Sequence, residues 1–336
     1  MFWIGLCLAI SAMLVGVRAL LLQFSAGLSA TGLSDRFSWG VYIQGFLALG
    51  SLAGGMLFLA GASGLFLGEA LLAPMAGATA LGCLAGAGVM IAADLGKPFR
   101  SFLLVFGKNT GSAMTWDFYT FALCGLLAFT AVIHGMVGAL PGLLWSALAL
   151  ITSSAFLLMH VLLLLPRQKS PANNPFLALE MFLRALWGGA ALLTLISFGV
   201  GLELGLSTVL LVLSLTLAPV HGVGLFAKQR PESAHAFSWV NRALMADMAI
   251  AAALLAGACS QTPFLSGLAA AAALLMLAWE KTRLVHAFQT QSVLPAPYSQ
   301  WQPAAPYKPS LLELQVCLGS LGLAMLATML ALRLVF

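Results

Sequence analysis

The chain has 336 residues, of which 61% are hydrophobic and only 7% carry a charge. Soluble domains contain roughly 25% charged residues, so this composition excludes a soluble fold and places most side chains against lipid or other helices. The formal net charge of +5 is dispersed over short segments between apolar stretches, which indicates membrane topology and not nucleic-acid binding.

Ten apolar stretches follow one another, each close to the roughly 20 residues that a membrane-spanning helix needs. In chain order we place these helices at residues 4–24, 39–67, 71–93, 118–140, 143–165, 180–202, 205–226, 241–259, 264–287 and 311–335. The first lacks a basic leading region and a small-residue cleavage site, so we expect a retained helix and a mature chain that starts at Met1. The sequence therefore predicts an all-α integral membrane protein with about ten transmembrane helices.

Proline and glycine mark several helix ends, as in Pro74, Pro141-Gly142, Gly201 to Gly205, and Pro263. The even-numbered connections between the predicted helices are a few residues long, and the odd-numbered ones are long: 25–38, 94–117, 166–179, 227–240 and 288–310. Thirteen of the 15 Lys and Arg residues lie in or beside the odd-numbered connections. The positive-inside rule therefore predicts cytoplasmic odd-numbered connections and periplasmic termini, in the inner (cytoplasmic) membrane of a prokaryote.

A weak internal repeat divides the chain. Trp39-Gly40 and Thr115-Trp116 have counterparts in Trp187-Gly188 and Ser238-Trp239. Two four-helix bundles, formed by the second to fifth and the sixth to ninth helices, would place these pairs equivalently, with the first and last helices flanking them. The predicted units are the first helix and its connection (1–38), an N-terminal bundle (39–165), a C-terminal bundle (166–287), and a loop with the last helix (288–336).

The cysteines carry no metal-site signal. Each stands alone in an apolar stretch, without the CxxC or CxxH spacing that holds a metal or a cluster. We therefore predict no metal site and interpret all five as small core residues. They are Cys7, Cys83, Cys124, Cys259 and Cys317.

The most informative polar segment follows the third predicted helix. That helix ends at Asp94, Pro98 prevents its continuation, and Lys97 and Arg100 follow at the membrane edge. One interpretation is a plain interfacial ion pair. The other is a polar pocket under an apolar roof, in which Asp94 exchanges protons and Arg100 or the Trp116 indole N–H binds a ligand oxygen.

Four motifs resemble the NrfD/PsrC family, which supplies the quinone-reactive membrane subunits of polysulfide-reductase-type complexes. That family is related to the dimethyl sulfoxide reductase membrane anchor. The motifs are Asp94-Leu95-Gly96-Lys97-Pro98-Phe99-Arg100, Ser112-Ala113-Met114-Thr115-Trp116, Phe37-Ser38-Trp39-Gly40-Val41-Tyr42-Ile43 and Tyr307-Lys308-Pro309-Ser310-Leu311-Leu312-Glu313. The last resembles the ten-helix branch. Asp117 departs from the small residue expected after Trp116, and we interpret it as a cap of the fourth helix.

The resemblance implies an anchor subunit that is not catalytic alone and has no haem, flavin or iron–sulfur cluster. Such a subunit binds menaquinone or ubiquinone and exchanges electrons with a ferredoxin-like iron–sulfur subunit, beside a molybdopterin or cytochrome subunit. A quinone needs two hydrogen-bonding ends, an aromatic slot and a proton supply. We assign catalysis to Asp94 and Arg100, and quinone binding to Trp39, Tyr42, Gln44, Lys97, Ser112, Trp116, Asp117 and Tyr119. Trp39 and Tyr42 can also be read as interfacial-belt aromatics.

Ionisable groups deeper in the spans cost roughly 2.5–3.5 kcal/mol each at mid-helix, so each needs a reason. His134, His160, His221 and Asp247 are candidates for a proton path, although a neutral histidine bonded to a neighbouring helix is the commoner outcome. The spacings of Glu180 with Arg184 and of Glu280 with Arg283 predict ion pairs on helix surfaces.

Two other functions compete with the quinone subunit. His160 and His221 lie at similar depth and could share a haem, as in a b-type cytochrome anchor. Ten helices in two four-helix units also fit a secondary transporter, although the clear proline breaks lie at helix ends and the polar clusters at one face.

Overall fold

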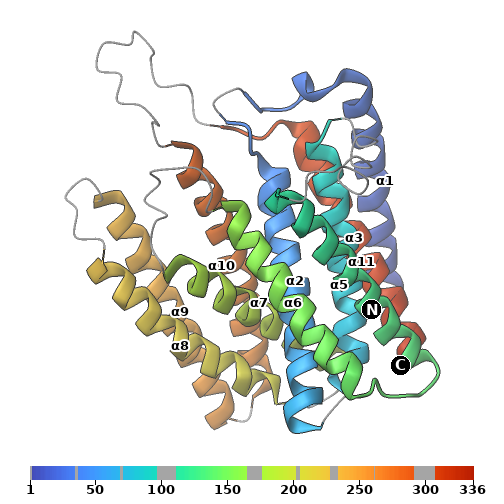
Figure 1. The fold of residues 1–336 in the computed structure, drawn as a ribbon, viewed down its shortest axis with the longest axis vertical. Coiled ribbons are helices and arrows are strands. Elements are labelled where there is room, and N and C mark those ends of the chain that lie inside the picture. The colour runs from blue at the N-terminus through green and yellow to red at the C-terminus, as the bar shows by residue number, and fades with distance from the viewer. Residues whose placement is uncertain are drawn as a thin grey trace.

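A computed structural model describes residues 2–34, 37–68, 71–96, 111–164, 176–201, 205–227, 234–260, 262–290 and 307–336. These residues form α-helices and no strand, which confirms the all-α prediction (Figure 1). The helices are α1 (Phe2–Ala26), α2 (Val41–Ala62), α3 (Leu72–Asp94), α5 (Ala113–Met136), α6 (Leu143–Leu164), α7 (Phe176–Val200), α8 (Leu206–Ala227), α9 (Ala234–Ser260), α10 (Pro263–Thr290) and α11 (Leu311–Val335). A 3-10 turn (Leu28–Ala30) follows α1, and a π-helical turn (Ser63–Leu67) extends α2.

Most helix ends agree with the prediction within a few residues, but the fourth helix is shifted toward the N-terminus. It covers Ala113–Met136 in place of residues 118–140. Ser112 precedes it with an extended backbone, and Gly138 follows it in the left-handed region at φ 67°, which an L side chain rarely adopts. As a result, Thr115-Trp116-Asp117 lies inside the helix and not in the connection before it.

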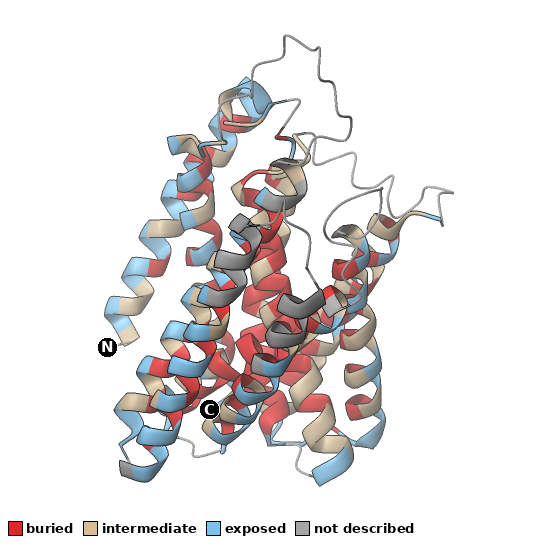
Figure 2. Cartoon of the chain, turned by 90° about the vertical axis from the view of Figure 1, so that its left-hand side faces the viewer, coloured by how far each residue is buried: buried red, intermediate tan, exposed pale blue. Residues whose placement is uncertain are grey.

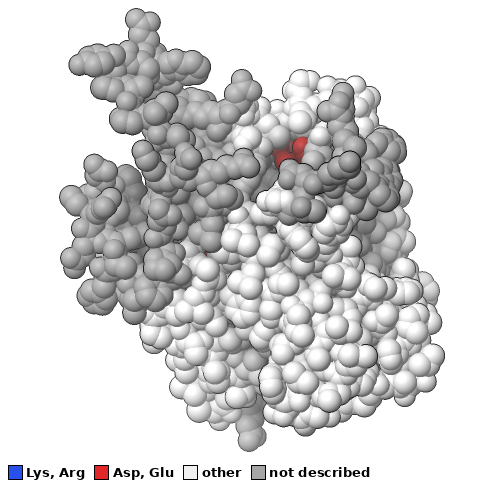
Figure 3. Space-filling view, in the orientation of Figure 1, with Lys and Arg blue, Asp and Glu red and all other residues white. Residues whose placement is uncertain are grey.

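The outer surface of the described residues is that of a membrane protein. By length and apolarity, nine of the described helices can cross a bilayer, and α8 contributes a shorter apolar stretch, Leu206–Leu217, before Pro219 inside the helix. Large apolar side chains such as Phe66, Leu144 and Leu275 are more than 70% exposed. Figure 3 shows a described surface that is almost uncharged on this face. The chain is therefore a multi-pass membrane protein.

The helices pack as two closed rings of four. The first ring is α2, α3, α5 and α6, and the second is α7, α8, α9 and α10, with each helix packed on its two ring neighbours. Helix α2 joins the rings through α7 and α10, while α11 packs on α3 and α1 packs on α11. The Arg333 guanidinium lies 4.9 Å from the centre of the Phe2 ring, so the two chain ends are neighbours (Figure 1).

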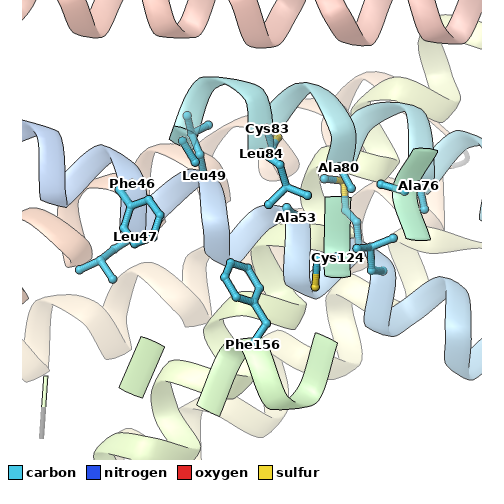
Figure 4. Close-up of a cluster of buried hydrophobic side chains, with 14 of the residues drawn as sticks. Phe46, Leu47, Leu49, Ala53, Ala76, Ala80, Cys83, Leu84, Cys124 and Phe156 are labelled. Carbon is cyan, nitrogen blue, oxygen red and sulfur yellow. The ribbon is translucent and has the colours of Figure 1, made fainter. Parts of the chain in front are cut away.

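The buried side chains gather in the central helices, and the outer faces are exposed (Figure 2). In the first ring the core includes Phe46 of α2, Cys83 of α3, Cys124 of α5 and Phe156 of α6 (Figure 4). Cys83 and Cys124 are therefore core residues as predicted. Cys7 and Cys259 are exposed and Cys317 is half-buried, because their helices turn these positions toward the apolar outer face, where a small thiol is tolerated.

The two rings touch through backbone contact between α2 and α7. A Cβ atom added at Gly55 would lie 1.9 Å from the carbonyl oxygen of Ala185, and one at Gly189 would lie 2.7 Å from the Gly55 backbone. Small residues at such crossings allow helices in a membrane to approach closely and gain van der Waals contact. Glycine at position 55 is therefore required for the observed contact between the rings.

Replacing Gly55 by alanine should destabilise the chain, because the helices must separate to relieve a contact with backbone atoms. We expect a loss of about 1–3 kcal/mol, as for other overpacked cores. Thermal unfolding of the purified chain in detergent measures it. Gly199→Ala in α7 is the matched control, since a Cβ there meets nothing within 4 Å. Equal melting temperatures for both variants would show that the rings do not depend on this crossing.

The alternation of long and short connections is confirmed. The connections after α2, α5, α7 and α9 span only residues 68–71, 137–142, 201–205 and 261–262. Two of the thirteen basic residues counted for orientation, Arg184 and Lys281, are fully buried in the second ring, which leaves eleven near the long connections. The remaining bias still predicts long connections in the cytoplasm.

A reporter active only in the periplasm, fused after Phe336, tests this orientation. We expect it to be active, because the positive-inside rule places the C-terminus outside. The same reporter fused in the 166–175 connection should be silent. The reverse pattern would show that the basic connections are held outside, for example by an acidic partner.

Candidate functional site

A polar cluster closes the long-connection end of the first ring. The Gln23 amide of α1 donates to the carbonyl oxygen of Ala93 at 2.9 Å, and the Tyr42 hydroxyl of α2 donates to the Gln23 amide oxygen. Gln23 and Tyr42 are 1% and 0% exposed. These bonds fasten α1 and α2 to the last turn of α3, and so they fix the position of Asp94, the final residue of that helix.

Asp94 has one buried carboxylate oxygen, Oδ1, with no hydrogen-bond partner among the described residues. The charge of Asp94 acts on Tyr42, and so does the charge of Glu313. A buried acceptor without a donor is costly, because it has lost water and gained nothing in return. The atom is therefore the part of this cluster best suited to meet a donor from a ligand. The predicted partners Lys97 and Arg100 lie outside the described residues.

Glu313 fastens the connection before α11 to the start of α2. It completes a capping box with Ser310, and its Oε2 accepts from the Ser310 and Gly32 backbone N–H groups at 2.7 and 2.8 Å. Its Oε1 accepts from the Tyr307 hydroxyl at 2.7 Å, and that hydroxyl accepts from the Val41 N–H at 3.0 Å. Burial raises the pKa of the Tyr307 phenol, so Tyr307 stays a neutral donor. This network supports the site from the loop side.

Asp117 and His160 form a second buried pair in the same ring. Asp117 Oδ1 of α5 lies 2.9 Å from His160 Nδ1 of α6, and the two residues are 4% and 1% exposed. The interpretation of Asp117 as a helix cap is wrong. Residue 112 occupies the cap position of α5, and Asp117 is one turn inside, where its carboxylate faces a histidine across the ring.

The His160 ring is enclosed by aromatic side chains and by α2. Phe46 stacks on it with ring centres 5.1 Å apart, and Phe156 meets it edge to face at 4.4 Å. A Cβ atom added at Gly50 would lie 2.6 Å from His160 Nε2, and this nitrogen has no hydrogen-bond partner among the described residues. Phe46 lies one helical turn from Tyr42 on α2, so the Asp94 and His160 clusters are adjacent along that helix.

Other predicted pocket residues lie around these clusters in different environments. Trp116 is 49% exposed on the outer side of α5, where it meets Tyr119 edge to face with centres 6.0 Å apart. The Trp39 peptide is held at both ends by the Gln289 side chain of α10, at 2.8 and 2.7 Å. Gln44 and Ser112 are half-buried. Trp116 and Tyr119 thus face away from Asp117, which points into the ring.

The four proton-path candidates are not brought together. His134 Nδ1 lies 2.7 Å from the Thr130 carbonyl oxygen, and His134 is 17 residues, about 25 Å of helix, beyond Asp117. His160 is paired with Asp117, while Asp247 lies in the second ring. The backbone of His221 lies in α8, but its side chain lies outside the described residues.

The second ring contains a buried charge cluster that corrects the prediction of helix-surface ion pairs. Arg184 is fully buried and binds Asp247 of α9 with both terminal nitrogens, at 2.5 and 2.6 Å. Its Nε lies 2.7 Å from Glu280 Oε2 of α10. Arg283 instead lies over the Trp279 ring, 5.6 Å from its centre. Charges in the interior must be paired, so the carboxylates turn inward to Arg184.

Sequence reasoning missed several residues of these networks as site residues. Gln23 had one available signal, since it is the only amide in the first apolar stretch. Tyr307 and Glu313 appeared only as part of a motif. Lys281 was taken for a residue beside a loop, although it is 0% exposed in α10.

Comparisons with known proteins add one relative. No family model matches the chain. A protein of Halobacterium salinarum that is named a "Putative dimethyl sulfoxide reductase membrane subunit" is 33% identical over 127 residues. This stretch is 37% of the present chain and 29% of the relative. The chain is therefore similar to a part, less than one third, of a protein named as an oxidoreductase membrane subunit.

Proposed function

We propose that the chain is the quinone-binding membrane anchor of a multi-subunit oxidoreductase. It would exchange electrons between an iron–sulfur partner subunit and the membrane quinone pool. The observation that carries the proposal is the buried, unpartnered Oδ1 of Asp94 at the polar end of the first ring. The similarity to a dimethyl sulfoxide reductase membrane subunit and the resemblance of the Asp94–Arg100 motif to the NrfD/PsrC family support it.

The described residues fit the chemical needs of a quinone. A quinone supplies two-electron chemistry coupled to two protons, so its site needs a proton donor or acceptor at each oxygen. Asp94 Oδ1 and His160 Nε2 are two buried polar atoms without hydrogen-bond partners among the described residues, and Phe46 adds a flat apolar surface beside His160. Both clusters lie at the long-connection end of the first ring.

The chain's own residues have distinct roles in this proposal. Asp94 holds and releases a proton at Oδ1, and Tyr42 and Gln23 keep the last turn of α3 in place. Asp117 orients His160 through Nδ1 and so directs Nε2 toward α2. The aromatic rings around His160 exclude water, which strengthens each of these polar contacts.

The two competing functions receive less support. A haem iron on His160 Nε2 would occupy the place where the imidazole approaches Gly50 of α2, and Nδ1 is paired with Asp117. For a transporter, a broken helix at mid-membrane is the expected sign. In the described residues α8 continues through Pro219 to Ala227.

Isolation of the native complex through a tag on this chain tests the proposed function. We expect an iron–sulfur subunit and a molybdopterin or cytochrome subunit to co-purify, and quinol or quinone turnover to require all of them. The complex should lose turnover when this chain is removed and regain it when the chain is added back. Purification of the chain without redox partners, together with solute uptake by vesicles that contain it alone, would contradict the proposal.

A further inference from the structure

The charge cluster of the second ring contains one group that its neighbours leave unsatisfied. Lys281 of α10 is fully buried, and its Nζ has no hydrogen-bond partner among the described residues. An ammonium group carries three donors, and it is costly to dehydrate one without providing acceptors. Arg184 in the same cluster is bonded on both sides. The contrast separates a fixed part of the cluster from a part that can change its charge.

The fixed part is Arg184 with its two carboxylates. The guanidinium cannot lose its proton, and it binds Asp247 and Glu280 directly. It also lies 4.7 Å from the centre of the Trp187 ring, whose indole N–H donates to the Ser214 hydroxyl at 2.8 Å. Every polar side chain around Arg184 therefore has a partner, as a permanent ion pair inside a membrane requires.

The variable part is Lys281 with Glu180. Glu180 is 8% exposed and close enough for its charge to act on Lys281, as do the charges of Glu280 and Arg184. Together the cluster holds three carboxylates and two cations, so its fully ionised form carries one uncompensated negative charge. One additional proton makes the cluster neutral, and a low-dielectric interior favours that state.

The position of these residues provides a route from the long-connection side. Glu180 lies four residues, about 6 Å, inside the start of α7, and Lys281 lies nine residues, about 13 Å, before the end of α10. The helices packed on α10 are α2, α7, α8 and α9. Besides the cluster, their titratable or charged groups are Tyr42 at the start of α2, His221 of α8, and His235, Arg242 and Cys259 of α9. The described Arg242 and Cys259 are exposed.

We propose that Lys281 is the proton-binding group of a site inside the second ring, with Glu180 as its exchange partner toward the long connections. In the exchange, the Lys281 ammonium gives one proton to the Glu180 carboxylate and becomes a neutral amine, and the carboxylate becomes a carboxylic acid. No electron moves. The Arg184–Asp247–Glu280 unit provides the constant charge against which this proton is bound. The site is separate from the quinone site proposed in the first ring and does not depend on it.

Nitrogen NMR of the full chain, labelled with 15N-lysine and placed in lipid nanodiscs, tests the proposal directly. The chain has six lysines, and Lys281→Met identifies the signal of interest by its loss. We expect that signal to move with pH between about 5 and 9, whereas exposed lysines change only near pH 10.4. A Lys281 signal that is constant over this range, as ammonium or as amine, would overturn the proposal.

Two further variants test the role of Glu180. Glu180→Gln removes a negative charge near the amine, so the Lys281 transition should move to lower pH. Arg283→Met, an exposed cation two residues away on the same helix, should leave it unchanged. An unmoved transition in Glu180→Gln would exclude Glu180 as the exchange partner. Should Lys281→Met not accumulate, Lys281→Gln gives the same assignment, and the pH response of the unmodified chain still decides the outcome.

Discussion

Replacing Asp94 by asparagine is expected to lower quinol turnover of the assembled complex about 100-fold or more, because a positioned acid–base group contributes about 10²–10⁴-fold. The asparagine keeps the size of the side chain but cannot exchange a proton at Oδ1. The Gln23 and Tyr42 bonds that hold the last turn of α3 do not involve the Asp94 side chain, so folding should survive. Turnover by purified complex, normalised to the amount of chain, is the measurement.

Two controls separate a chemical role of Asp94 from a structural one. Asp94→Glu keeps the acid and should retain more turnover than Asp94→Asn. Arg333→Gln, at the opposite end of the molecule beside Phe2, should leave turnover unchanged. Full activity in Asp94→Asn with normal assembly would remove Asp94 from the proposed quinone site. Loss of the partner subunits from the complex would instead assign it to docking.

Replacing Arg184 by methionine is expected to destabilise the chain by about 3–5 kcal/mol, because two buried carboxylates would lose their only strong counter-charge. Asp247 and Glu280 are 0% and 3% exposed, so water cannot replace the guanidinium. Many membrane proteins do not accumulate after such a loss. The amount of folded chain in membranes and its melting temperature in detergent measure the effect.

A variant that removes the carboxylates together with the cation provides the decisive comparison. The triple change Arg184→Met, Asp247→Leu and Glu280→Met should recover most of the lost stability, because apolar residues of similar volume often replace a buried ion pair without cost. Arg283→Met, on the exposed side of α10, should change the melting temperature little. If the single Arg184→Met variant were as stable as the unmodified chain, the cluster would not be a tight ion network.

The sequence alone determined the fold class and the membrane layout of this protein. Apolar stretches of about 20 residues have few alternatives to a spanning helix, because each backbone polar group in lipid must find its partner inside the helix. The long and short connections alternate as predicted, and α11 covers the predicted residues 311–335. Asp94 was also recognisable, since an acid beside Pro98 at a helix end is a local pattern.

Tertiary structure decided which polar groups meet. Asp117 and His160 lie on different helices, and Arg184 meets Asp247 across 63 positions of sequence. The spacing of Glu180 and Arg184 fits a surface ion pair equally well, so local periodicity pointed to the wrong partner. In helices that are apolar on most sides, hydropathy does not show which side faces lipid and which faces the ring interior. That choice depends on close helix crossings such as Gly55 against Ala185, and it determines whether a charge is exposed, paired or left without a partner.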